Sequence, residues 1–137
     1  MLDLGEFALV WSDEFDDESL DPSKWTEFRC DGDRAVIRQG GWWHTDFATI
    51  EDGCLHISTT YQTRGYGGGK AGWYSCGICT TGLFEQTFGY FEIRCVLPKG
   101  EGMWSAFWLL PEDSSHTVGN GGLDGAELDV MESPNYR

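Results

Sequence analysis

The stretch GYFEIRCVLPKGEGMWSAFWLL, residues 89–110, carries the clearest structural pattern in this sequence. Apolar and polar side chains alternate through residues 89–97, which is typical of a strand with one buried face. Residues 98–102, Pro-Lys-Gly-Glu-Gly, predict a turn, and residues 103–110 predict the next strand. Short strands separated by turns of this kind favour antiparallel β-sheets.

The rest of the chain follows the same plan. We expect strands over Ala8–Phe15 and Ala126–Glu132, and a hairpin over Ala48–Thr60 whose turn is Glu-Asp-Gly. The charges and glycines of Arg29–Gly41 predict a loop. Because no segment has sustained helical periodicity, the sequence predicts an all-β protein, an antiparallel β-sandwich.

The composition limits the classes of function. The chain has 137 residues, which is room for one domain. Its 23 acidic residues against 9 basic ones give a formal net charge of −14, which makes nucleic acid and anionic membranes unfavourable partners. No apolar run reaches the roughly 20 residues that a membrane-spanning helix needs, and no signal peptide is visible at the start. The 7 Trp, 8 Phe and 5 Tyr residues supply either a bulky core or flat platforms for sugar rings.

The five cysteines leave two interpretations open. Their odd number means that at least one has no disulfide partner within the chain. Cys76 and Cys79 form a C-x-x-C pair, but a zinc site needs a second pair or nearby histidines. We therefore favour buried thiols over metal or redox chemistry, and the disulfide status stays open.

Three carboxylates lie within six residues of an apolar strand, at Glu127, Asp129 and Glu132. In a regular strand Glu132 points away from the other two, because successive side chains alternate. One extra residue at Val130-Met131, a β-bulge, brings all three carboxylates to one face. The carboxyl groups of Glu127 and Glu132 would then end ~5–6 Å apart, near the ~5–5.5 Å of retaining glycosidases.

The alternative is an acidic edge strand whose charges only discourage aggregation. The preceding strand favours the catalytic interpretation. Trp104 and Trp108 are four residues apart and share a face with Ala106. Two indole rings aligned in this way form a track on which sugar rings can stack.

Two runs of the sequence resemble glycoside hydrolase family 16. The first, residues 88–111, contains a G-x-W-x-x-F-W element, and the second is ELDVME at residues 127–132. The openings LVWSDEF at 9–15 and LDPSKW at 20–25 also resemble the start of that family's domain. The E-x-D-x-x-E element is highly specific in combination with the first run, and the resemblance covers nearly the whole chain.

The resemblance implies a concanavalin A-like β-jelly roll with a carbohydrate cleft on its concave face. It implies endo-hydrolysis of β-linked polysaccharides with retention of anomeric configuration, without a cofactor. By position, Glu127 matches the family's nucleophile, Glu132 its acid/base, and Asp129 the carboxylate that assists the nucleophile. Trp104 and Trp108 match tryptophans of the cleft.

The substrate stays open within the family. A β-1,3- or mixed-linkage glucan is the commonest choice, but agarases and carrageenases share the E-x-D-x-x-E element. Many β-1,3-glucanases of the family carry an Asn-Asn-Glu-type segment where this chain has residues 34–43. Arg38, Trp42 or Trp43 are candidates to line a minus subsite there, although packing or a surface position explains each of them singly.

Other functional classes share part of this pattern. A lectin-like jelly roll would bind through the tryptophans without chemistry, but it has no need of three converging carboxylates. A transglycosylase would use the same residues with another acceptor. A purely structural all-β protein would use none of them.

Domains of family 16 are much longer than this chain, which ends five residues after Glu132. We therefore expect residues 1–137 to be a single incomplete catalytic domain, the N-terminal portion of a jelly roll truncated after the catalytic strand, and poorly stable and inactive alone. We assign no metal ligands. A structural calcium ion occurs in many relatives, but no D-x-D-x-D cluster supports one here. A polysaccharide substrate implies an extracellular location, and we expect the complete form to be a monomer.

Overall fold

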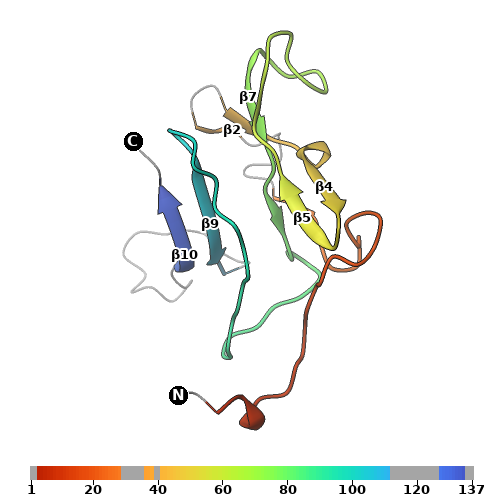
Figure 1. Ribbon diagram of the computed structural model, residues 1–137, viewed down its shortest axis with the longest axis vertical. Coiled ribbons are helices and arrows are strands. Elements are labelled where there is room, and N and C mark those ends of the chain that lie inside the picture. The colour runs from red at the N-terminus through yellow and green to blue at the C-terminus, as the bar shows by residue number, and fades with distance from the viewer. Residues whose placement is uncertain (1–2, 29–35, 39–40, 112–126, 135–137) are drawn as a thin grey trace. The chain divides into compact units, whose positions relative to one another are not determined.

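The structure, a computed structural model, describes residues 3–28, 36–38, 41–111 and 127–134. The chain divides into two compact units, Met1–Gln86 and Thr87–Arg137, and each is described by itself. The described residues contain β-strands and two short 3₁₀ helices but no α-helix (Figure 1), so the all-β prediction is confirmed. No helix among them is long and apolar enough to cross a membrane.

The first unit contains short elements throughout its described part. They are η1 (Leu4–Glu6), β1 (Thr26–Glu27), β2 (Val36–Arg38), β3 (Gly41–Trp43), η2 (Thr45–Phe47), β4 (Ala48–Glu51), β5 (Cys54–Ile57), β6 (Thr60–Gln62), β7 (Gly72–Ser75) and β8 (Ile78–Cys79).

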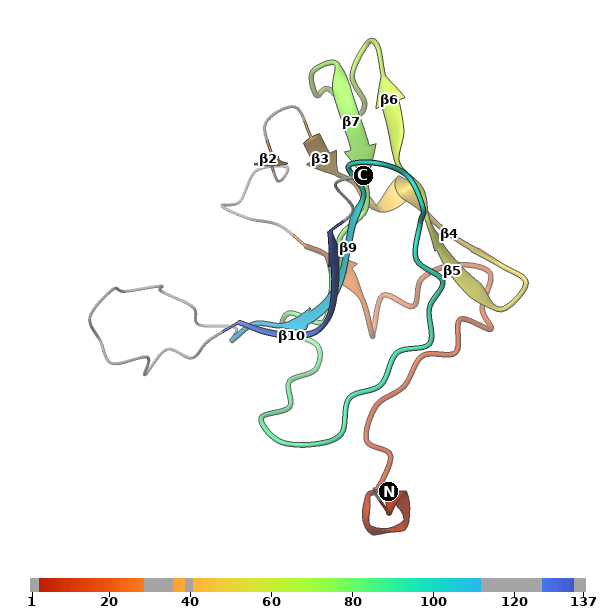
Figure 2. The same ribbon diagram turned by 60° about the vertical axis from the view of Figure 1, so that its left-hand side comes forward.

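A four-stranded sheet with the order β2-β3-β7-β6 organises this unit. β3 and β7 run parallel, a departure from the antiparallel pattern that the other two pairs of the sheet follow. Figure 2 shows β6 and β7 side by side. β1 pairs with β8, and β4 with β5, in two further antiparallel pairs.

The β4–β5 hairpin confirms the prediction for residues 48–60. Ala48 pairs with Ile57 and Glu51 with Cys54, so two residues, Asp52 and Gly53, make the turn. Their φ angles are both positive, 52° and 67°, as the tightest hairpin turns require. Asp-Gly tolerates this backbone better than most residue pairs, so the turn sequence fixes the register of the hairpin.

The core of the first unit is aromatic. Phe47, Tyr74 and Cys76 are buried, and Trp42 stacks on Tyr74 with ring centroids 5.3 Å apart. The Tyr74 hydroxyl donates a hydrogen bond to the carbonyl oxygen of Lys70 at 2.8 Å, which offsets the cost of removing that hydroxyl from water. Partly buried residues pack around these three: Trp42, Ala48, Tyr66 and Ile78.

Cys76 is a buried thiol, in line with the interpretation of the C-x-x-C pair. Among the described residues, Cys54, Cys76, Cys79 and Cys95 are free. Burial raises the pKa of Cys76 to about 12, and the nearby carboxylate of Glu27 adds to the effect. The thiol is therefore protonated at neutral pH, which makes it a poor metal ligand and a poor nucleophile.

We expect Cys76 in the folded protein to resist alkylation at pH 8, with the exposed Cys54 and Cys95 modified at least about tenfold faster. Mass spectrometry of peptides after timed iodoacetamide labelling measures each thiol separately, and labelling in guanidinium should remove the difference. The unfolded thiol titrates near 9.0 and the folded one near 12, so the contribution of Cys76 to the free energy of unfolding is complete below pH 9 and is lost as the pH rises toward 12. Labelling of folded Cys76 at the rate of Cys54 would contradict the expected protection of the Cys76 thiol from alkylation.

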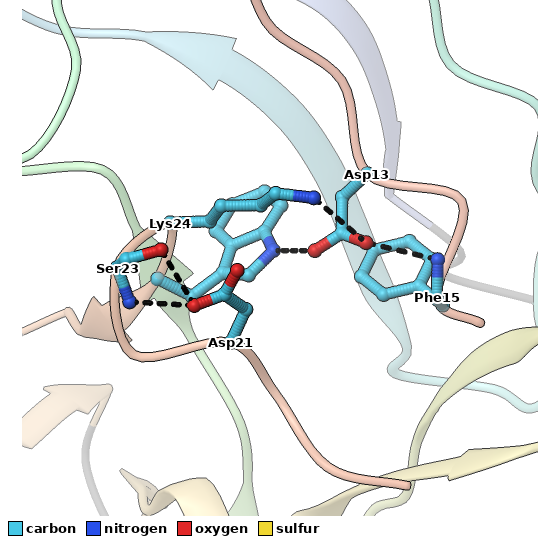
Figure 3. A network of polar contacts seen from close by, with 6 residues as sticks. Asp13, Phe15, Asp21, Ser23 and Lys24 are labelled. Atoms are coloured by element: carbon cyan, nitrogen blue, oxygen red, sulfur yellow. Dashed lines mark hydrogen bonds and ion pairs between the residues drawn. The ribbon is translucent and has the colours of Figure 1, made fainter. Parts of the chain in front are cut away.

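Residues 8–15 form no strand, so that prediction is wrong. Asp13 makes local contacts there instead of a ladder (Figure 3). Its carboxylate accepts hydrogen bonds from the Phe15 amide at 2.9 Å and from Trp25 Nε1 at 2.7 Å. Phe15 has a positive φ of 57°, which interrupts extended backbone, and Trp11 packs edge-on against Trp25 at 5.1 Å.

A capped turn at residues 21–25 presents two residues to Asp13. The Asp21 carboxylate accepts hydrogen bonds from the hydroxyl and the amide of Ser23, at 2.6 and 2.8 Å, and these bonds lower the pKa of Asp21. Lys24 Nζ then lies 3.7 Å from Asp13 Oδ1 (Figure 3). The turn thus ties residues 11–15 to the start of β1.

Strand β2 lies inside the range for which the sequence predicts a loop, and this is a second correction. Val36 pairs with Trp42, and Arg38 with Gly41, with a register shift between the two pairs. A three-residue strand with an irregular register is too short to show alternation in the sequence. Residues 29–35 and 39–40 lie outside the described residues.

The second unit contains β9 (Trp104–Leu109) and β10 (Leu128–Pro134), which pair antiparallel. Both strands confirm predictions, with ends displaced by one or two residues. Residues 89–97, in contrast, form no strand, and that prediction is wrong. Val96 is 98% exposed. Alternation supplies a face for a sheet, but a strand also needs a neighbouring strand, and no β-ladder among the described residues includes this segment.

Candidate active site

The pairing of β9 with β10 brings several predicted site residues together. Asp129 lies opposite Trp108, and Glu132 lies opposite Ala106. The register shifts between these pairs, because Val130 is an extra residue that pairs with none on β9. The β-bulge predicted at Val130-Met131 is therefore confirmed.

The bulge determines which face of the strand pair each side chain of β10 points to. Residues directly opposite each other in a ladder point to the same side, so Asp129 and Glu132 share a face with Ala106 and both tryptophans of β9. The opposite face carries mainly half-buried side chains: Ser105, Phe107, Leu109, Met131 and Ser133, together with the exposed Leu128.

Glu127 immediately precedes β10. If the ladder is continued by one pair, Glu127 falls opposite Leu110 and on the face of Asp129. Glu127, Asp129 and Glu132 are all exposed, so a ligand can approach them from solvent. The separation of their carboxyl groups stays a prediction.

Trp104 contacts one of these carboxylates directly. Its Nε1–H donates a hydrogen bond to Glu132 Oε1 at 2.9 Å. The side chain is still 43% exposed. Ala106, which lies opposite Glu132, is the smallest of the three β9 side chains on this face.

The remaining predicted subsite residues belong to the first unit. Trp43 is half-buried: its ring lies 5.3 Å from that of Phe28, and it covers Gly77, where a Cβ would come within 2.3 Å of the indole. Trp42 packs into the core. Arg38 lies in β2, and its side chain lies outside the described part of the structure.

The sequence pattern did not single out an exposed aromatic pair in the first unit. Tyr61 on β6 and Trp73 on β7 are directly opposite each other, with ring centroids 5.4 Å apart. Trp43 pairs with Ser75, two residues after Trp73, so Trp43 belongs to the same face of the sheet. Only the aromatic richness of GWYS at 72–75 indicated this pair, and aromatic residues are common in cores as well.

A metal site finds no support in the described part of the chain. No group of three or more His, Cys, Asp or Glu side chains there is arranged to hold a metal ion. The structural calcium ion stays a prediction.

The fold and this strand pair define a class of protein: an all-β protein with two carboxylates and two tryptophans on one face of a strand pair. No family model matches the chain. The β-glucanase of Rhodothermus marinus is 35% identical to this chain in an alignment 138 residues long. That alignment covers 92% of this chain and 43% of the Rhodothermus protein. The catalytic domain of an endo-1,3-β-glucanase (laminarinase) from Thermotoga petrophila gives a TM-score of 0.74 at 32% identity, over 95% of this chain and 52% of that one. A non-specific endo-β-1,3(4)-glucanase from family GH16 gives a TM-score of 0.72 at 26% identity, over 93% of this chain and 51% of that one.

This chain is therefore similar to proteins of glycoside hydrolase family 16, and the resemblance inferred from its motifs is confirmed. The predicted fold class, a β-sandwich of the jelly-roll type, is confirmed by the same structures. The chain spans 52% and 51% of the solved structures described above, and 43% of the Rhodothermus protein.

Proposed function

We propose that the protein is a retaining endo-glycoside hydrolase that acts on a β-1,3- or mixed-linkage glucan. The observation that carries this proposal is the bulge in β10, which gives Asp129 and Glu132 one exposed face beside Trp104 and Trp108. Relatives named as glucan hydrolases favour a β-glucan over agar or carrageenan.

The proposed reaction has two steps, and neither requires a cofactor. In the first, the ionised carboxylate of Glu127 bonds to the anomeric carbon while Glu132 gives its proton to the departing oxygen. In the second, Glu132 takes a proton from water as the water oxygen bonds to the same carbon and Glu127 departs. Asp129 assists Glu127 by holding its rotamer.

The aromatic residues are proposed to hold the polysaccharide. Trp104 and Trp108 flank Ala106 on the carboxylate face of β9, where their rings can stack on successive sugars. Trp43 and Arg38 are proposed for further subsites. A polymeric substrate is too large to enter a cell, so we propose an extracellular location. We also propose that the complete enzyme is a monomer.

The test is hydrolysis of laminarin, a β-1,3-glucan, by the protein made from its complete reading frame. We expect a rapid fall in polymer length with release of reducing ends, and early products of β-configuration by proton NMR, as retention requires. Barley β-glucan, agarose and κ-carrageenan separate the substrate classes. Binding of a glucan without release of reducing ends would support the lectin-like alternative.

A further inference from the structure

The hydrogen bond between Trp104 and Glu132 joins the two strands of the candidate site. Trp104 Nε1 donates to Glu132 Oε1 at 2.9 Å. Trp104 pairs directly with Pro134, so Glu132 is its diagonal neighbour on the same face, a distance that long side chains can bridge. The sequence places both residues on one face but does not show that they touch.

We propose that Trp104 is a positioning residue for the acid/base Glu132, an inference that rests on the proposed function. An indole N–H is only a donor, so the oxygen that accepts it, Oε1, is held toward Trp104. A protonated carboxyl group has a single O–H, and that proton then sits on Oε2. Trp104 thereby selects the oxygen of Glu132 that faces the glycosidic bond.

This arrangement serves both steps of the reaction. In the first, the Oε2 proton moves to the glycosidic oxygen as its bond to the anomeric carbon breaks, and Glu127 forms the new bond to that carbon. In the second, Oε2 takes a proton from water, the water oxygen bonds to the anomeric carbon, and the bonding pair returns to Glu127. The indole N–H stays on Oε1 throughout and forms its strongest hydrogen bond when Glu132 is ionised.

Trp104 is also a candidate platform for a sugar ring, and one substitution separates the two roles. Trp104→Phe keeps an aromatic face but removes the N–H. We expect kcat on laminarin to fall about tenfold to a hundredfold, the size expected for a lost hydrogen bond to a charged group, with KM changed much less. A platform alone predicts the reverse split, with kcat unchanged and KM raised, and that result would overturn the proposal.

The dependence on Glu132 is tested in two further ways. In a Glu132→Ala background, Trp104→Phe should cause no additional loss of kcat, because the group that it positions is absent. With an aryl β-glycoside whose leaving group needs no protonation, Trp104→Phe should leave the first step unchanged. An equal loss in both backgrounds would overturn the proposal.

Trp25 supplies a matched control. Its Nε1 donates to Asp13 Oδ2 at 2.7 Å, so Trp25→Phe removes the same kind of bond within the first unit, which does not contain the carboxylate strand. Its kcat per folded molecule should match that of the wild-type protein. A loss like that of Trp104→Phe would mean that any such change disturbs the enzyme, and would overturn the proposal.

The contact also has a readout that does not need turnover. In ¹⁵N–¹H spectra the indole N–H of Trp104 should shift upfield in Glu132→Gln, because a neutral amide oxygen is a weaker acceptor than a carboxylate. An unchanged resonance would overturn the contact itself. A shifted resonance in a protein that hydrolyses no polysaccharide would overturn the proposed function and, with it, the positioning role of Trp104. Full kcat in Trp104→Phe would overturn this inference alone.

Discussion

Glu132→Ala is expected to lower kcat on laminarin by about 10²–10⁴-fold, because the leaving oxygen then departs without general acid assistance. Glu127→Ala should reduce hydrolysis to the background rate, since no covalent intermediate can form. Release of reducing sugars, measured over hours at high enzyme concentration, covers this range. Wild-type turnover by either variant would end the assignment of both residues.

Azide distinguishes the role of each carboxylate. With a dinitrophenyl β-glycoside, Glu132→Ala still forms the covalent intermediate on Glu127, and azide should then yield the β-glycosyl azide. In Glu127→Ala azide takes the place of the missing carboxylate, so the product should be the α-glycosyl azide. If the two variants gave the opposite anomers, the roles of Glu127 and Glu132 would be exchanged.

Neither substitution should unfold the protein. Both side chains are exposed, and surface changes of this kind usually alter the free energy of unfolding by no more than about 0.5 kcal/mol. Glu101→Ala is the matched control, because Glu101 is an exposed carboxylate in the turn before β9. We expect it to have wild-type turnover, and a thermal melt of each variant checks folding.

More features of the candidate site than of the fold could be predicted from the sequence. Side-chain alternation is a local property of a strand, so the faces of Trp104, Trp108 and Asp129 followed from counting residues. The bulge followed from the same count, because Glu132 joins that face only if one residue is left unpaired. The contact of Trp104 Nε1 with Glu132 did not follow, since a rotamer depends on packing that a residue count does not contain.

The errors have a common physical cause. Residues 89–97 alternate as well as any strand, but pairing is a property of two segments, and alternation shows only one of them. Residues 8–15 have strand-like composition, yet the Asp13 carboxylate binds the Phe15 amide locally and competes with any ladder. β2 was missed for the opposite reason: its partner β3 supports a three-residue strand whose own sequence shows no pattern.

Deletions in β10 should have an effect that depends on the number of residues removed. Loss of Val130 alone, or of Met131 alone, leaves a regular ladder in which Asp129 still faces Trp108 and Glu132 still faces Ala106. Loss of both residues puts Glu132 on the face opposite to that of Asp129 and Glu127. If the N-terminal end of β10 keeps its register, Glu132 changes face; if the C-terminal end keeps it, Asp129 and Glu127 change face instead.

We therefore expect both single deletions to retain more activity than Glu132→Ala, and the double deletion to retain no more than that variant. Displacements of about 1 Å can still cost a single deletion on the order of 10²-fold, so kcat per folded molecule is compared across the series, with circular dichroism as the folding check. The two single deletions control for packing, because either Met131 or Val130 then takes the position opposite Phe107. Equal activity in the single and double deletions would mean that the face of Glu132 does not matter for hydrolysis. A large difference caused by removing one more residue is a result that only side-chain alternation predicts.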